Sequence, residues 1–225
     1  MPLVSLDDEK ETGTGASTLI STTATASVPN DLAVTLACGN SNSGGVIGQA
    51  PDASWTATPA TEAFSKMIAA AGALTVSQPI NSLYDTLQVL MLFKTIPGKI
   101  PVFVQRGNGS GGSLLQNPNA FTLGAGNSLL WLCNAGGSPG GGTSFQNAQG
   151  LAWSLLSNIT RHSVDGGFDH YANLIAWYTE NVPAKFIPAG GLQLNVSSGG
   201  TWELLEISNL VVGGLRLLLS LGVGI

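Results

Sequence analysis

The sequence predicts an all-β protein made of two tandem β-sandwich or jelly-roll-like modules, with one short helix. Three observations lead there: segments with alternating apolar side chains, stretches rich in Gly, Asn and Pro between them, and a similar order of features in both halves. Hydrophobic residues make up 44% of the chain and charged residues only 9%, against about 25% in ordinary soluble domains. The chain can therefore bury a core, while Ser, Thr, Asn, Gln and Gly supply the rest of the surface.

The two halves resemble each other over several segments. Thr18–Cys38 aligns without a gap on Ser113–Cys133, with apolar residues meeting apolar residues. Each half later carries a Tyr-x-x-Leu segment that runs to Pro-x-Lys, Tyr84–Lys99 in the first half and Tyr171–Lys185 in the second. Alternation with a period of two predicts that one face of each segment is apolar. These faces comprise Leu87, Val89, Met91 and Phe93 in the first half, and Leu174, Ala176 and Tyr178 in the second.

This internal repeat predicts the domain organisation. An N-terminal extension covers residues 1–15, and its run of acids is unlike a signal peptide. The two modules cover residues 16–106 and 113–212, and the Gly-rich segment 107–112 between them is the expected linker. Residues 213–225 form an apolar C-terminal tail.

One segment carries helix signals instead of strand signals. Thr58 is a suitable N-cap, Pro59 follows at the first helical position, and Gly72 closes an alanine-rich stretch. We therefore expect a short helix between Thr58 and Gly72.

The charge of the chain excludes one class of partner and favours another. The eight basic residues are scattered, and the formal net charge is −5. Nucleic-acid binding needs a concentrated basic surface, so we expect none. A low charge suits a chain that packs against copies of itself.

The C-terminal tail is the expected docking element. It is apolar, but far shorter than the roughly 20 residues that span a bilayer, so we expect it to pack against protein. Its candidate docking residues are Leu215, Leu217, Leu218, Leu219 and Leu221.

Two glycine patterns resemble catalytic or cofactor motifs but lack the context these need. Gly107–Gly112 matches a dinucleotide fingerprint, yet no helix signal follows it. Gly136–Gly140 matches a nucleophile elbow, yet more glycines follow it where a helix must begin. We interpret both as loops, and we expect no catalytic residues, no cofactor and no enzymatic activity. The competing hydrolase hypothesis rests on the carboxylates of Asp165, Asp169 and Glu180.

The segment Arg161–His170 gathers both histidines and two acids. Carboxylates and imidazoles can form a metal site or a polar binding loop, and Asp165, Asp169 and His170 are the candidate ligand-binding residues. The spacing matches no strong metal signature, so we expect no metal. The Asp-Gly-Gly sequence instead favours the tip of a solvated hairpin.

Cysteine and tryptophan positions give two further expectations. If the halves superpose, Cys38 and Cys133 lie in separate cores and are free and buried; a disulfide between them is the alternative. Trp202 lies beside Gly200 and is the candidate for an exposed aromatic that stacks on a sugar. We expect core positions for the other tryptophans, Trp55, Trp131, Trp153 and Trp177.

Several cues together resemble β-sandwich modules of tailed-phage virion proteins. They are the Asn-x-Leu strand starts at Asn30–Leu32 and Asn127–Leu129, a Trp after a Gly-rich loop, the Tyr-x-x-Leu strands, and a final strand at Trp202–Ser208. The resemblance implies a capsid decoration, head-fibre or tail component, located in the virion and bound to copies of itself and other virion proteins. The alternative is a lectin-like module that binds a carbohydrate or receptor, such as a host surface glycan.

Overall fold

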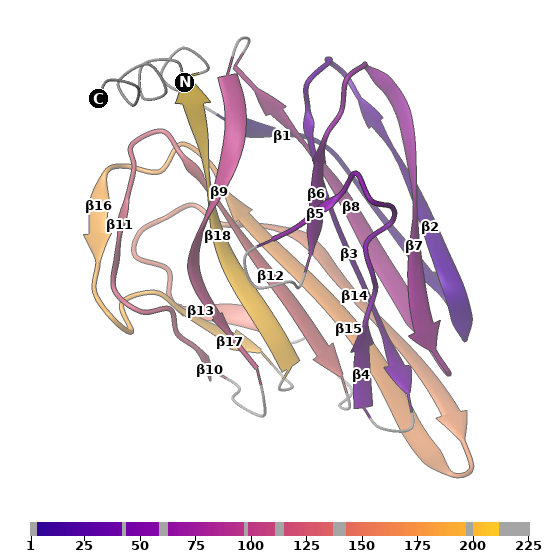
Figure 1. Ribbon diagram of the computed structural model, residues 1–225. Coiled ribbons are helices and arrows are strands. Elements are labelled where there is room, and N and C mark those ends of the chain that lie inside the picture. Colours follow the sequence, from indigo (N-terminus) through magenta and orange to yellow (C-terminus); the bar gives the residue numbers. More distant parts are fainter. Residues whose placement is uncertain are drawn as a thin grey trace, which may run out of the picture.

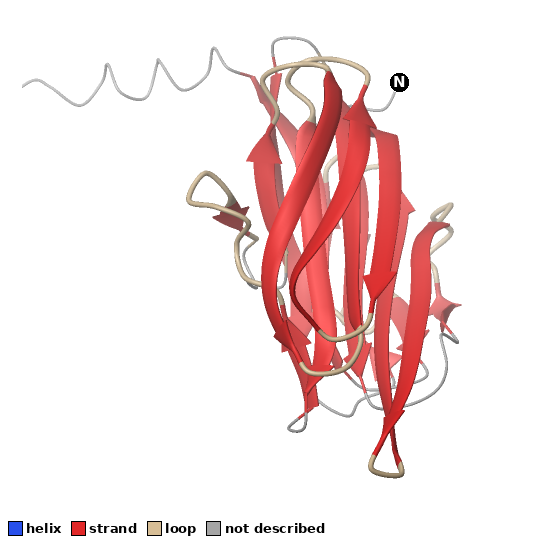
Figure 2. Ribbon diagram, turned by 90° about the vertical axis from the view of Figure 1, so that its right-hand side faces the viewer, coloured by secondary structure: helices blue, strands red, loops and turns tan. Residues whose placement is uncertain are grey.

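The computed structural model describes residues 4–41, 44–58, 63–96, 99–110, 115–136, 143–196 and 200–211. Throughout this part of the chain, every regular element is a strand (Figures 1 and 2). The all-β prediction is therefore confirmed.

The first half forms one large sheet and a two-stranded layer. The first large sheet has the order β1 (Val4–Thr14), β8 (Thr86–Thr95), β3 (Leu32–Ser41), β6 (Phe64–Met67) and β5 (Thr56–Ala57), and β4 (Gly44–Ile47) also pairs with β3. The β2–β7 layer pairs β2 (Ser17–Ala26) with β7 (Gly72–Ser82).

The strands from Lys99 onward form another large sheet and two short ones. The second large sheet has the order β14 (Ser154–Asp165), β15 (Phe168–Thr179), β12 (Ser128–Gly136), β18 (Gly200–Val211) and β9 (Lys99–Gly109). The short outer sheets are β10 (Leu115–Gln116), β17 (Gln193–Val196) and β13 (Thr143–Asn147), and β11 (Phe121–Leu123) with β16 (Lys185–Ile187).

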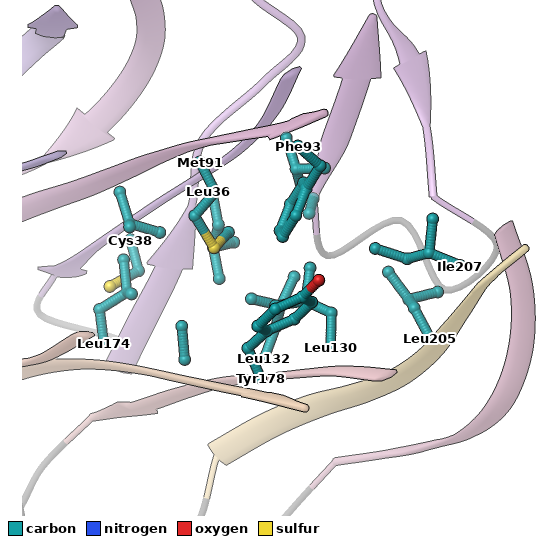
Figure 3. Packing of buried hydrophobic residues seen from close by; sticks show 14 of the residues in the cluster. Leu36, Cys38, Met91, Phe93, Leu130, Leu132, Leu174, Tyr178, Leu205 and Ile207 are labelled. Carbon is teal, nitrogen blue, oxygen red and sulfur yellow. The ribbon is translucent and has the colours of Figure 1, made fainter. Parts of the chain in front are cut away.

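The main core lies between the two large sheets (Figure 3). Every second residue of each strand points into it, because successive side chains of a strand face opposite sides of the sheet. The first sheet supplies Leu32, Val34, Leu36, Cys38, Leu87, Val89, Met91 and Phe93; the second supplies Leu130, Leu132, Ala172, Leu174, Ala176, Tyr178, Leu205 and Ile207. The expected faces of β8 and β15 are thus confirmed.

The outward faces of both large sheets are buried as well. Ala33, Leu90 and Leu92 pack beneath the β2–β7 layer, and Leu129, Trp131 and Leu204 pack beneath the short outer sheets. Strands covered on both faces read as continuous apolar runs, which accounts for the buried sequence of β3. Within the described residues, the sheets therefore stack in four layers, and hydrophobic clusters fill the spaces between successive layers.

Two modules with separate interiors are not confirmed, because the main core takes residues from both halves. Strand pairings also cross the expected boundaries. The N-terminal extension contains β1, which pairs with β8, and β9 starts within the expected first module but pairs with β18 of the second large sheet. The expected linker begins inside β9, whose Gly109 pairs with Trp202.

The alignment of Cys38 on Cys133 does not preserve side-chain direction. Cys38 points into the main core, whereas Cys133 points to the other face of its sheet, into the core beneath the short outer sheets. In β12 it is Leu130 and Leu132 that face the main core. A one-residue offset in a strand turns every side chain to the other face, so the apolar match concealed the offset.

The expected helix is wrong for the described residues. Residues 59–62 lie outside them, and Phe64–Met67 forms β6, which pairs with β3 and β5. The helix signals at Thr58 and Gly72 are local, and pairing with an existing sheet overrides such weak preferences. Gly72 instead opens β7 with a φ of +125°.

Candidate functional site at the hairpin end

The β14–β15 hairpin extends beyond the neighbouring strands at one end of the molecule (Figures 1 and 2). Asp165 pairs with Phe168 across Gly166 and Gly167, whose φ angles are +57° and +83°. Two successive positive φ values define a turn that glycine adopts without strain and that matches the twist of a hairpin. The hairpin-tip interpretation of Arg161–His170 is therefore confirmed.

An aromatic stack supports one face of the hairpin. Tyr84, from the turn between β7 and β8, stacks on His170 with ring centroids 3.6 Å apart and an interplanar angle of 9°. Its hydroxyl donates to Asp165 Oδ2 at 3.4 Å. Burial, with the Asp165 carboxylate adding to it, raises the pKa of Tyr84. The phenol therefore stays neutral and keeps its proton for Asp165.

A second pair of rings lies on the opposite face of the hairpin. His162 stacks on Tyr171 with centroids 4.4 Å apart, and its Nε2 lies 2.8 Å from Asp169 Oδ1. His162 and Tyr171 are also cross-strand neighbours, as are Val164 and Asp169. The polar side chains of the tip are therefore engaged with one another along the hairpin.

The base of the hairpin is tied to the first large sheet. Arg161 Nε lies 3.4 Å from Oδ1 of buried Asp85. Asn40 Nδ2 donates to the Tyr171 carbonyl at 3.2 Å, and Cys38 Sγ donates to the Asn173 carbonyl at 3.6 Å. These contacts join residues far apart in sequence and fix the direction in which the hairpin projects.

The tip exposes large apolar side chains despite these contacts. Phe168 is 73% exposed and Val164 is 63% exposed. Because they occupy successive pairs of the β14–β15 register, they lie on opposite faces of the hairpin. Leu83, beside Tyr84, and Leu19, near the start of β2, are also exposed at this end. We call Leu19, Leu83, Val164 and Phe168 the hairpin end.

Of the residues expected to bind a ligand, Asp165 and His170 lie on one face of this tip and Asp169 lies on the other. The structure adds Tyr84, which the sequence did not indicate, and gives a contact to His162, which was noted in this segment but not named as a ligand-binding residue. Tyr84 is distant in sequence, and only the pairing of the two halves brings it to the hairpin.

Trp202 is not part of the hairpin end, and its expected exposure is wrong. It is 8% exposed, and its ring centroid lies 5.5 Å from that of Trp131. A Cβ on Gly109 would lie 2.6 Å from the Trp202 indole nitrogen, so the missing side chain makes room for the ring. The other tryptophans are confirmed in or against cores: Trp55, Trp131, Trp153 and Trp177.

Both cysteines are free and buried, as expected, so the disulfide alternative is wrong. They lie in different cores, and burial raises the pKa of each thiol to about 12. Neither thiol is therefore primed as a nucleophile.

The carboxylates of the hydrolase hypothesis do not form one site. Asp169 lies near the start of β15, whereas Glu180 follows its last residue and lines a pocket of about 450 Å³ with Ser5 and Leu6. At about 3.3 Å per residue, the length of β15 separates them by roughly 35 Å. Paired glycosidase carboxylates lie within roughly 10 Å of each other. A smaller pocket of about 260 Å³ lies between Gly13 of β1 and Arg161 of β14.

Across the described ranges, no group of three or more His, Cys, Asp or Glu side chains is placed to hold a metal ion. The same residues include no helix with the length and apolar character needed to cross a membrane. The docking leucines of the C-terminal tail lie outside the described residues.

Comparisons with protein-family models, with curated proteins and with solved structures found no match, so the hairpin end is interpreted from its own geometry.

Proposed function

We propose that the chain is a structural protein of a virion, which acts by binding copies of itself and other virion proteins through the hairpin end. The observation that carries the binding role is the exposure of Phe168 and Val164 on opposite faces of a projecting, well-supported hairpin. The virion setting rests on the resemblance of the strand sequences to phage β-sandwich modules.

The geometry favours insertion into a partner over contact with a flat surface. A tip with one apolar side chain on each face buries both only when the partner surrounds it. Full burial of such side chains contributes about 1.5–3 kcal/mol each before ordering costs. The stack of Tyr84 on His170 lowers those costs, because it holds the tip in place before binding.

Low charge supports a protein partner. With 9% charged residues, the chain has little electrostatic repulsion to oppose contact between copies. The sugar-binding alternative loses its main observation, because Trp202 is buried. We therefore propose only the assembly role.

The internal duplication belongs to this proposal. The pairs β3–β8 and β12–β15 are both antiparallel, and both turn an apolar face to the main core. We propose that the two large sheets descend from one duplicated unit whose copies came to share a core.

Phe168→Ser tests the role of the hairpin end. We expect the variant to fold normally and to lose self-association in sedimentation velocity, together with incorporation into particles. Phe186→Ser is the matched control, because Phe186 is 62% exposed but lies on β16, in a short outer sheet. Unchanged assembly of Phe168→Ser would overturn the proposal, as would equal losses for both variants.

A further inference from the structure

The N-terminal strand β1 turns acidic side chains toward the main core. It is an edge strand, paired only with β8 among the described strands. Glu9 lies opposite Met91 and Glu11 opposite Val89. Directly opposed residues of an antiparallel pair share a face, and Met91 and Val89 belong to the main core. The carboxyl groups of Glu9 and Glu11 therefore lie on the main-core side of β1.

The environment of Glu9 is poor for a charged carboxylate. Its Oε1 atom is buried and accepts no hydrogen bond. Glu11 on the same face accepts a hydrogen bond of 2.6 Å from Ser157 Oγ of β14. Burial, with the charges of Glu11 and Asp8 adding to it, raises the pKa of Glu9 to about 7. A proton on Glu9 removes the charge that this position solvates badly.

A second buried carboxyl lies where β1 meets the start of β3. Asp31 is fully buried, and no N–H or O–H group donates to either of its oxygens. The group that faces it is Asp7 of β1, which accepts hydrogen bonds from Ser27 and pairs with Lys94 Nζ at 2.8 Å. Burial, with Asp7 adding to it, raises the pKa of Asp31 to about 7. For Asp7, burial acts against ionisation, but Lys94 and Ser27 outweigh it and lower the pKa. Of the two neighbouring carboxyls, Asp31 therefore takes up a proton before Asp7 does as the pH falls.

The basic groups around the two acids are already engaged. Lys10 of β1 favours the charged form of Glu9 but pairs with Asp8 at 2.6 Å. Lys94 of β8 favours the charged form of Asp31 but pairs with Asp7. Arg161 of β14 lies beside Gly13 of β1 and pairs with Asp85. None of these three cations forms an ion pair with Glu9 or Asp31.

We propose that β1 is a proton-gated strap, which stays on β8 while Glu9 and Asp31 are protonated and separates from it when they lose their protons. Separation leaves the edge of β8 unpaired, and an open edge can accept another strand. The inference stands on the contacts of β1 and does not depend on the proposed assembly role.

The direction of the pH dependence follows from linkage. Glu9 and Asp31 hold their protons more tightly while β1 is docked on β8 than when β1 is released. The stabilisation is complete below about pH 4, the ordinary range of carboxyl pKa values, and falls as the pH rises toward about 7. Above that pH the contribution is lost.

Hydrogen exchange measured by mass spectrometry, at about pH 5.5 and about pH 8.5 and corrected for intrinsic rates, tests the strap. We expect the amides of Val4–Thr14, and those of Thr86–Thr95 that bond to β1 and not to β3, to lose at least about tenfold in protection at the higher pH. The double variant Glu9→Gln/Asp31→Asn, whose amides imitate protonated carboxyls, should keep its protection. Asp52→Asn is the control, because Asp52 lies in an exposed turn with Ser54, and it should respond to pH as the unmodified chain does.

Equal protection of β1 at both pH values in the unmodified chain would overturn the strap, as would a double variant that still responds to pH. If Asp31→Asn prevents folding, Glu9→Gln alone decides the question: a smaller pH response supports the strap, and an unchanged response contradicts it.

Discussion

Two cores lie on the outward faces of the large sheets, one beneath the β2–β7 layer and one beneath the short outer sheets. They differ in the side chains that fill them. The β2–β7 layer covers the first large sheet with aliphatic side chains, namely Ile20, Ala24, Ala26, Val76 and Ile80. Its solvent face carries paired hydroxyls such as Thr23 and Thr75, 2.7 Å apart. The short outer sheets cover the second large sheet with aromatic rings. Both interiors are close-packed, as protein cores are, but two long paired strands do it here with aliphatic side chains and the short outer sheets do it largely with rings.

The aromatic outer core should give the largest stability effect. Trp131 is fully buried, contacts the rings of Phe145, Trp153 and Trp202, and donates to Gln116 Oε1 at 2.8 Å. Trp131→Ala removes these contacts and leaves a large cavity, so we expect a loss of about 3–5 kcal/mol in the free energy of unfolding. Urea denaturation measures it, with Trp131→Phe as the milder control. A loss below about 1 kcal/mol for the alanine variant would contradict the prediction that the rings packed around Trp131 stabilise this core.

The β2–β7 side should be more sensitive to polar changes. Buried Gln88 accepts from Thr22 Oγ1 at 2.9 Å and its amide donates to Thr35 Oγ1 at 3.1 Å. Gln88→Leu leaves both buried hydroxyls without these partners, at an expected cost of about 1–3 kcal/mol. The control Thr23→Val, on the exposed face of β2, should cost under about 0.5 kcal/mol in the same denaturation assay. If the two variants cost the same, the buried network is not what stabilises this layer.

Features that depend on neighbouring residues could be predicted from the sequence. The alternation in β8 and β15 gave their core faces, and Asp-Gly-Gly gave the hairpin, because period and turn chemistry are local. The helix signals near Thr58 misled, because β6 pairs with a distant strand.

Features set by pairing between distant strands did not show in the sequence. The joining of β9 to β18 brings Gly109 beneath Trp202, which buries a ring that looked exposed. The stack of Tyr84 on His170 requires the two large sheets to face each other, and no short motif records that arrangement. The candidate site was therefore found only in part: its hairpin was predicted, but its support was not.

The shared main core predicts that the two halves unfold together, and the expected separation between their transitions is zero. Four of the tryptophans lie in the second half, so intrinsic fluorescence reports chiefly on that half. Thiol labelling of Cys38, buried in the main core on β3, reports on the first half when its peptide is followed by mass spectrometry separately from that of Cys133. If the large sheets stabilise each other, the urea midpoints from the two probes coincide, because neither sheet can lose its partner and stay buried. A chain with two independent interiors would give a separate midpoint for each probe. Thr58→Val sharpens the comparison, because Thr58 Oγ1 donates to buried Glu203 across the halves at 2.6 Å, and its loss should lower both midpoints equally.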